Sequence, residues 1–72
     1  LFMSIGEEMG VTVSHIVGAI LGETGLPPSV IGTVDVRARH LFADVSSKHA
    51  SEIVAKLNRT RFKGHPLKVR AL

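Results

Sequence analysis

The chain contains three phenylalanines, and two of them lie in short runs where apolar residues alternate with other types. Phe2 is in the first such run, and Phe42 follows His40 by two positions in a later one. Alternation of this kind is typical of β-strands, and it predicts that Phe2, His40 and Phe42 point away from the core. Unpaired nucleic-acid bases stack on aromatic rings exposed in this way. We therefore predict base stacking by Phe2 and Phe42, with His40 close to them, and assign Phe62 to the core. The alternative is that Phe2 or Phe42 packs beneath a terminal segment or inside a larger parent protein.

Basic residues are concentrated in the second half of the chain. Residues 1–36 contain four acidic side chains and no Lys or Arg, whereas residues 37–72 contain all nine basic side chains against two acidic ones. This asymmetry favours a polyanionic partner whose phosphates the cations would hold. The alternative is that these charges only keep the surface solvated. The candidate phosphate-binding residues are Arg37, Arg39, Arg59, Arg61, Lys63, Lys68 and Arg70.

Length and composition favour one small domain over residues 1–72. A chain of this size buries only ~60% of its unfolded surface, so two separate cores are not expected. The absence of cysteine excludes disulfides and thiolate zinc sites, and it favours a reducing compartment, which we expect to be the cytoplasm. No apolar run approaches the ~20 residues of a membrane span, so no membrane partner is expected. Because the chain starts at Leu1, we expect it to be part of a longer protein.

Hydrophobic periodicity predicts four strands and two helices. Thr12 is a suitable N-cap for the first helix, Gly25 a suitable C-terminal residue, and Ser46 a suitable N-cap for the second helix. Gly18 and Gly22 lie on one face of the first helix, where we expect a neighbouring element to approach closely. The predicted strands span residues 1–5, 31–37, 40–45 and 66–70, and the predicted helices span 13–24 and about 47–58.

This β-α-β-β-α-β order predicts an α+β, ferredoxin-like sandwich. Right-handed crossovers give a four-stranded antiparallel sheet with both helices on one face. The first and third strands are then central neighbours, which brings Phe2 close to His40 and Phe42. The residues predicted to point to the uncovered face of the sheet are Phe2, Ser4, Thr33, Asp35, Arg37, His40, Phe42, Asp44, Lys68 and Arg70.

Two segments resemble the sequence signatures of the RNA recognition motif. Residues 1–5 resemble its RNP2 strand, with Phe2 at the stacking position, and residues 39–45 resemble RNP1, with His40 and Phe42 at the two stacking positions. More specifically, the chain is similar to the C-terminal RNA-binding domain of bacterial DEAD-box RNA helicases of the DbpA/CsdA kind. The similarity rests on Gly10-Val11-Thr12, Ile16-Val17-Gly18-Ala19-Ile20, Glu23-Thr24-Gly25, Ile31-Gly32, the short link before His40, and Arg59-Thr60-Arg61-Phe62-Lys63-Gly64-His65-Pro66-Leu67.

The resemblance implies an RNA-binding module that follows an ATP-driven helicase core in the same chain and tethers it to structured RNA, with ribosomal RNA as the expected target. No cofactor or metal is implied for these residues. The chain departs from the usual pattern at Ala38-Arg39, which replaces the basic–glycine pair that opens RNP1, and it lacks the long loop between the second and third strands. These departures give residues 59–70 a larger share of the expected contact with RNA.

Other kinds of chemistry find little support in the sequence. The histidines show no metal-binding spacing, and no Walker motif or nucleophile–histidine pair is present, so we expect no catalysis by these residues. The main alternative is a protein-interaction or dimerisation module with the same fold. An acylphosphatase is disfavoured because Glu7 and Glu8 occupy the place of its anion-binding loop.

Overall fold

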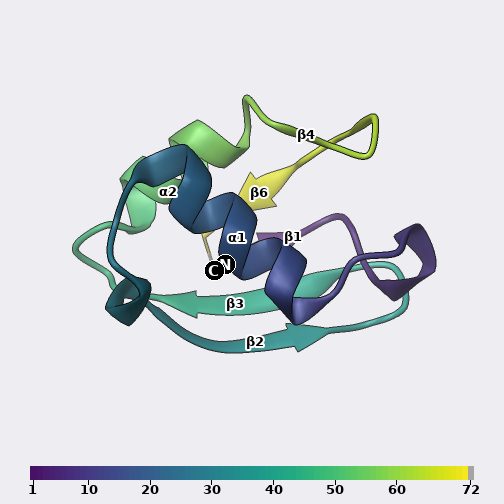
Figure 1. Ribbon diagram of the computed structural model, residues 1–72, viewed down its shortest axis with the longest axis horizontal. Coiled ribbons are helices and arrows are strands. Elements are labelled where there is room, and N and C mark those ends of the chain that lie inside the picture. Colours follow the sequence, from purple (N-terminus) through teal and green to yellow (C-terminus); the bar gives the residue numbers. More distant parts are fainter. Residues whose placement is uncertain (72) are drawn as a thin grey trace.

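The computed structural model describes residues 1–71, and its elements follow the predicted order except for an additional hairpin between the second helix and the last strand (Figure 1). Within these residues, two α-helices and six short strands are joined by loops that include two 3₁₀ helices. The elements are β1 (Phe2–Met3), η1 (Glu7–Met9), α1 (Val13–Thr24), η2 (Pro28–Val30), β2 (Ile31–Val36), β3 (Leu41–Val45), α2 (Ala50–Leu57), β4 (Arg61–Phe62), β5 (His65–Pro66) and β6 (Val69–Arg70).

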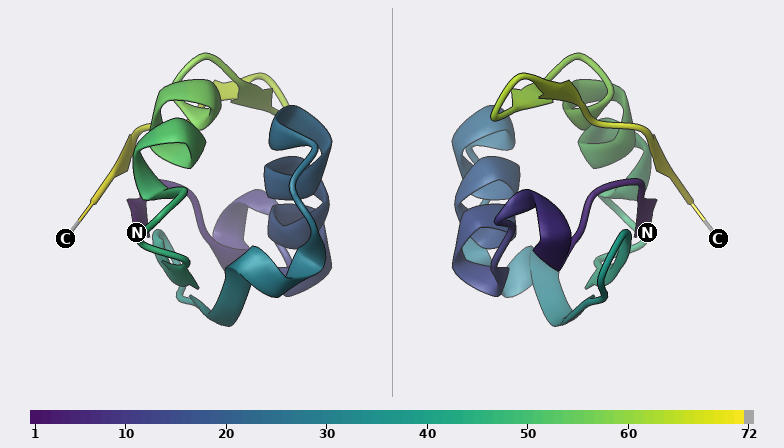
Figure 2. Two further views of the ribbon diagram at one scale, coloured as in Figure 1. Left: turned by 90° about the vertical axis from the view of Figure 1, so that its left-hand side faces the viewer. Right: turned by 90° about the vertical axis from the view of Figure 1, so that its right-hand side faces the viewer.

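The main sheet has four antiparallel strands in the order β2-β3-β1-β6. Strand β1 is an interior strand of this sheet, in which Phe2 pairs with Phe42 of β3 and with Arg70 of β6. Both helices cover the same face of this sheet (Figures 1 and 2). The predicted ferredoxin-like fold is therefore confirmed.

The core lies between the helices and the inner face of the sheet. On the strands, Met3 and Leu41 are fully buried and alternate with the half-buried Phe2 and Phe42. This alternation confirms the predicted strand phase. The buried apolar residues are Met3, Ile5, Val11, Ile16, Ile20, Val30, Leu41, Ala43, Ile53, Leu57, Leu67 and Val69.

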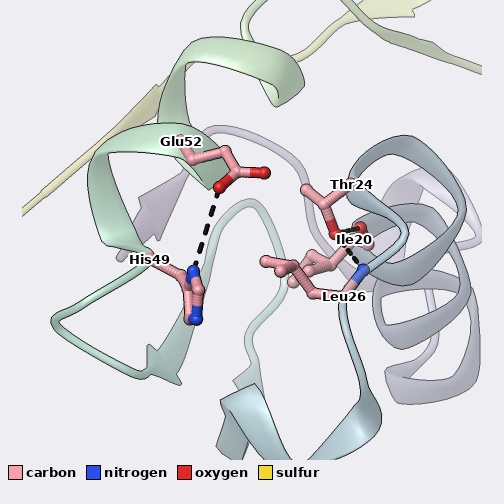
Figure 3. Close-up of polar contacts among 5 residues, drawn as sticks. All are labelled: Ile20, Thr24, Leu26, His49 and Glu52. Atoms are coloured by element: carbon pink, nitrogen blue, oxygen red, sulfur yellow. Dashed lines mark hydrogen bonds and ion pairs between the residues drawn. The ribbon is translucent and has the colours of Figure 1, made fainter.

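Helix α1 begins and ends as the sequence predicts. The Thr12 hydroxyl accepts a hydrogen bond from the His15 backbone N–H, and the His15 ring accepts one from the Thr12 N–H, so the cap is reciprocal. At the other end, Gly25 adopts a left-handed conformation with φ of 69°. The Thr24 hydroxyl donates to the Ile20 carbonyl at 2.7 Å and accepts from the Leu26 N–H at 3.3 Å, which secures the exit from the helix (Figure 3).

Helix α2 begins later than the sequence predicts, and Ser46 is not its cap. The helix starts at Ala50, and the backbone before it forms a turn in which the His49 N–H donates to the Ser46 carbonyl. The Ser46 N–H is bound to the Val30 carbonyl at 2.8 Å, so this residue still follows the sheet. In the first helical turn, His49 Nδ1 lies 3.8 Å from a carboxylate oxygen of Glu52 (Figure 3).

The predicted last strand is divided. Residues 61–66 form a separate two-stranded hairpin, β4–β5, and β6 contains only Val69 and Arg70. Strand β1 is also shorter than expected, because its ladder pairing covers only Phe2 and Met3. Pairing still extends to the next residue, since the Ser4 N–H donates to the Lys68 carbonyl at 3.2 Å.

The expected close approach at Gly18 and Gly22 is wrong. A Cβ atom built on either residue would meet no other atom within 4 Å, and both glycines are exposed. The tight contact occurs at Gly6, where an added Cβ would lie 2.6 Å from the His40 backbone nitrogen and collide with the carbonyl of Arg37. Gly6 therefore allows the loop after β1 to pack directly against the β2–β3 turn.

These environments predict opposite effects of alanine at the helical glycines and at Gly6. Gly18→Ala and Gly22→Ala should each stabilise the domain by about 0.5–1 kcal/mol, because alanine has the higher helix propensity and no neighbour obstructs its methyl group. Gly6→Ala should destabilise it by roughly 1–3 kcal/mol, because the backbone of the β2–β3 turn must move. Urea unfolding of the three variants measures both effects, and destabilisation by Gly18→Ala would contradict the open environment described here.

Candidate nucleic-acid interface

Three aromatic rings gather on the face of the sheet that the helices leave uncovered. The rings of Phe2 and His40 are stacked with centroids 5.6 Å apart. The Phe42 ring meets both edge-on, at 5.7 Å from Phe2 and 5.3 Å from His40. We name Phe2, His40 and Phe42 the aromatic cluster. The structure thus brings together the three residues predicted to stack on bases, and their contact with RNA stays a prediction.

Strand β6 places a cation directly on this cluster. The Arg70 guanidinium carbon lies 4.8 Å from the centroid of the Phe2 ring, which is a cation–π distance. Lys68 is exposed just before the strand. Beside Phe2 the surface is hollowed into an open concavity of ≈ 330 Å³, lined by Phe2, Ser4, Asn58, Lys68, Val69 and Arg70. The concavity therefore combines an aromatic wall, a hydroxyl and two cations.

Asn58, which the sequence analysis did not single out, fixes the outer edge of β6. Its side-chain amide donates to the Val69 carbonyl at 2.9 Å and accepts from the Val69 N–H at 2.8 Å. This pair of bonds imitates the backbone pairing of a neighbouring strand, so β6 is held on both sides. No local sequence pattern reveals a bond between the residue that ends a helix and a strand residue eleven positions later. The position of Arg70 over Phe2 depends on it.

Two of the predicted phosphate-binding residues have acidic partners. Arg37 forms an ion pair with Asp35 at 2.7 Å, and Arg39 lies 3.3 Å from Glu8. The hydrogen bond from Arg37 lowers the pKa of Asp35, and the same bond raises the pKa of Arg37. Both pairs are exposed, so solvent and salt weaken them. They still offset part of the positive charge that RNA would meet at this end of the sheet.

The β2–β3 turn is fastened to the loop after β1. The Glu7 N–H donates to the Arg37 carbonyl at 2.8 Å, and the Glu8 N–H donates to the Ala38 carbonyl at 2.9 Å. Together with the close packing at Gly6, these bonds make the turn part of the folded body. The tight hairpin predicted from the short Ala38-Arg39 link is confirmed.

Four of the five other predicted cations separate into two groups, and Arg59 lies apart from both. Lys68 and Arg70 lie beside the aromatic cluster, whereas Arg61 and Lys63 lie on the β4–β5 hairpin, which is outside the main sheet. Arg59 is exposed in the turn after α2. Within residues 1–71, none of these five cations forms an ion pair with a carboxylate. Their charges are thus available to a partner.

Metal binding finds no support in the part of the chain that the structure describes, because it contains no group of three or more His, Asp or Glu side chains arranged for a metal ion. Over the same residues, neither helix has the length and apolar character needed to cross a bilayer.

Comparison with known proteins identifies the family. Residues 1–71 match the DbpA RNA binding domain. The chain belongs to this family. It is 30% identical over 70 residues to the ATP-dependent RNA helicase DeaD of Escherichia coli K12, and the DeaD proteins of Shigella flexneri and Klebsiella pneumoniae match equally well. The alignment covers 97% of this chain but only 11% of each relative.

Membership of the DbpA family bears out the resemblance found in the sequence. It makes this stretch an RNA-binding domain and not the catalytic core of a helicase. The chain spans about a ninth of the length of the curated relatives it matches.

The pairing of Asp35 with Arg37 generates a prediction for RNA affinity. Asp35→Asn removes a negative charge opposite Phe42 and frees Arg37, so RNA should bind about two- to fivefold more tightly, as expected from the modest ~0.2–1 kcal/mol of an exposed ion pair. Fluorescence anisotropy with single-stranded RNA measures the change. Asp44→Asn, at another exposed position of the same sheet, is the matched control for loss of one acidic charge. Equal gains in both variants would show that freeing Arg37 has no effect of its own.

Proposed function

We propose that this domain binds RNA by stacking unpaired bases on Phe2, His40 and Phe42, while nearby cations hold the phosphates. The observation that carries the proposal is the position of Phe2, which lies between Phe42 and Arg70 on neighbouring strands and contacts both. The proposed phosphate contacts are Arg59, Arg61, Lys63, Lys68 and Arg70, with smaller contributions from Arg37 and Arg39.

The aromatic cluster suits unpaired bases better than a base-paired duplex. Bases stack on aromatic faces with about 1–3 kcal/mol each, and such stacking needs little sequence preference. A base paired within a duplex cannot present its face to a flat sheet. The half-buried rings of the cluster support one another through their mutual contacts, so the platform exists before RNA arrives. This preorganisation reduces the conformational entropy lost on binding.

The concavity beside Phe2 supports the same mode of binding. Its aromatic wall continues the stacking surface, and Lys68 and Arg70 provide positive charge within reach of a phosphate. The Ser4 hydroxyl is a donor and acceptor that could bond a ribose 2′-OH, which distinguishes RNA from DNA. The Asn58 amide is already engaged by Val69, so we assign it a supporting role and no base contact.

We further propose that the domain is part of a longer protein in the cytoplasm, where it tethers an ATP-dependent DEAD-box helicase core to structured RNA. The similarity to DeaD, named as an ATP-dependent RNA helicase, supports this arrangement. The proposed partners are therefore the helicase core of the same chain and a structured RNA, of which ribosomal RNA is the first candidate. The domain itself needs no cofactor for this task.

Replacement of a stacking ring tests the proposal directly. Phe42→Ala should weaken binding of single-stranded RNA by about 1–3 kcal/mol, or roughly 5- to 150-fold, since one base loses its platform. The variant should keep a cooperative melting transition, because the ring lies outside the buried core. Anisotropy titration and thermal melting measure the two properties.

Thr33→Ala, at an exposed position on β2, is the control for this variant and should bind RNA as the wild type does. An unchanged affinity in folded Phe42→Ala would contradict stacking. A tight dimer in sedimentation that buries Phe2 and Phe42 without RNA would favour the interaction-module alternative.

Salt dependence tests the phosphate contacts separately. If five cations each neutralise one phosphate, the slope of log affinity against log salt should be about −3.5, from ~0.7 per contact, for a single-stranded RNA long enough to reach both the main sheet and the β4–β5 hairpin. Lys68→Ala should reduce the steepness of this slope by about 0.7, because it removes one contact. Titrations at several salt concentrations give the slope, and a salt-independent affinity would rule out the proposed electrostatic contribution.

A further inference from the structure

The turn of the β4–β5 hairpin contains a lysine in an unusual conformation. Lys63 has φ of +49° and Gly64 has φ of +82°, and these two residues alone connect Phe62 to His65. A two-residue turn with both φ angles positive is the type I′ turn, whose first position favours Asn, Asp or Gly. A residue with a longer side chain is disfavoured there. The backbone of the turn therefore gives no reason for lysine, which points to a role for its ammonium group.

The Lys63 side chain joins a second group of aromatic and basic residues. Its Nζ lies 5.7 Å from the centroid of the Phe62 ring and 3.4 Å from the carbonyl oxygen of Gly10. The Phe62 ring lies 5.4 Å from the ring of His15, which is exposed in the first turn of α1. The hairpin is thus fastened to the beginning of α1. We name His15, Arg61, Phe62, Lys63 and His65 the hairpin cluster.

The hairpin cluster is on a different side of the molecule from the aromatic cluster. The hairpin is a separate two-stranded sheet, and it lies on the side of the molecule opposite to β2 (Figures 1 and 2). His15 belongs to α1, which covers the inner face of the main sheet, whereas Phe2 and Phe42 lie on the outer face. A single nucleotide stacked on the main sheet therefore does not occupy the hairpin.

The electrostatic setting of the hairpin cluster favours a polyanion. Residues 53–71 contain no acidic side chain, and Arg61 and Lys63 are exposed and form no ion pair with any carboxylate among residues 1–71. Gly10, whose carbonyl Lys63 contacts, directly follows η1, which contains two glutamates. Of these, Glu8 is paired with Arg39, and Glu7 is exposed. A lysine beside an aromatic ring and an exposed arginine two positions before it, both without carboxylate partners, match the chemistry of a phosphodiester backbone.

We propose that the hairpin cluster is a second RNA-binding surface, which holds the phosphate backbone of a segment other than the one stacked on the main sheet. Arg61 and Lys63 bind the phosphates, and the paired rings of His15 and Phe62 hold the hairpin against α1. This inference rests on the proposed RNA-binding function and extends it: the domain contacts two segments of one folded RNA. Two binding surfaces of this kind suit an RNA stem with a single-stranded extension, because the stem presents phosphates and the extension presents bases.

Lys63→Asn tests the inference, because its effects on stability and on RNA binding have opposite directions. Asn-Gly is a preferred type I′ turn, so the melting temperature should rise by a few degrees. Affinity for a stem-loop RNA with a single-stranded tail should fall about three- to tenfold, with a salt slope less steep by about 0.7–0.9. Affinity for a short oligouridine, which is long enough only for the main sheet, should stay unchanged. Anisotropy titrations with both RNAs and thermal melting measure these effects.

Two further variants distinguish the charge of Lys63 from other causes. Lys63→Arg keeps the positive charge and should retain the affinity of the wild type for the stem-loop RNA. Lys48→Asn removes one exposed positive charge before α2, away from the hairpin, and should leave the stem-loop affinity within twofold of the wild type.

The outcomes separate this inference from the proposed function. Wild-type stem-loop affinity in a stabilised Lys63→Asn variant would overturn the second surface while leaving stacking on the main sheet intact. Equal loss for both RNAs would also overturn it, since a single surface would then bind both. Failure of the wild-type domain to bind either RNA would overturn the proposed function itself. Selective loss for the stem-loop RNA, together with loss of oligouridine binding in Phe42→Ala, would establish two surfaces.

Discussion

The pairing of β1 on both sides determines which residues of this domain face outward. The strand has only two residues in the ladder, yet it lies in the middle of the sheet, between β3 and β6. Met3 is fully buried among the helices, so Phe2 must face the other way. A shift of pairing by one residue would bury Phe2 and expose Met3. Backbone bonds beyond the ladder, from Ala43 N–H to the Leu1 carbonyl and from Ser4 N–H to the Lys68 carbonyl, help to hold the register.

The edges of the sheet are controlled by contacts that come from outside it. The Asn58 amide closes the outer side of β6 and keeps Arg70 above Phe2. At the other end, the loop around Gly6 holds the β2–β3 turn by two backbone hydrogen bonds, from Glu7 and Glu8. An RNA recognition motif with a long loop here could close that loop over RNA. In this chain the short turn is fixed, so the uncovered face of the sheet stays open, and the proposed contacts with RNA come from the sheet, β6 and the hairpin.

The sequence predicts the elements that repeat a pattern over several residues. Alternation identified β2, β3 and the outward direction of Phe2 and Phe42, and the caps of α1 followed from Thr12 and Gly25. The β4–β5 hairpin was missed because strands of two residues are too short to show alternation. The start of α2 was misplaced because Ser46 resembles an N-cap, and only the hydrogen bond from its N–H to the Val30 carbonyl shows that the chain has not yet left the sheet. Gly18 and Gly22 suggested close packing, since a helix gives no local sign of whether its glycines face a neighbour or solvent.

The candidate site was predictable in its residue types but not in its balance of charge. All cations lie in the second half of the sequence, but in the folded domain two acidic residues pair with two of them. Asp35 pairs with Arg37, and Glu8 pairs with Arg39, thirty-one positions away. Both pairs lie towards the β2–β3 turn, whereas Lys68 and Arg70 at β6 have no carboxylate partner within residues 1–71. The uncovered face thus changes from positive at β6 towards neutral at β2. In the proposed complex, phosphates are attracted mainly at β6, and bases reach across the rings towards β3. Because the hairpin directly precedes β6 in the chain, an RNA held on both proposed surfaces would reach the aromatic cluster from the β6 edge of the sheet.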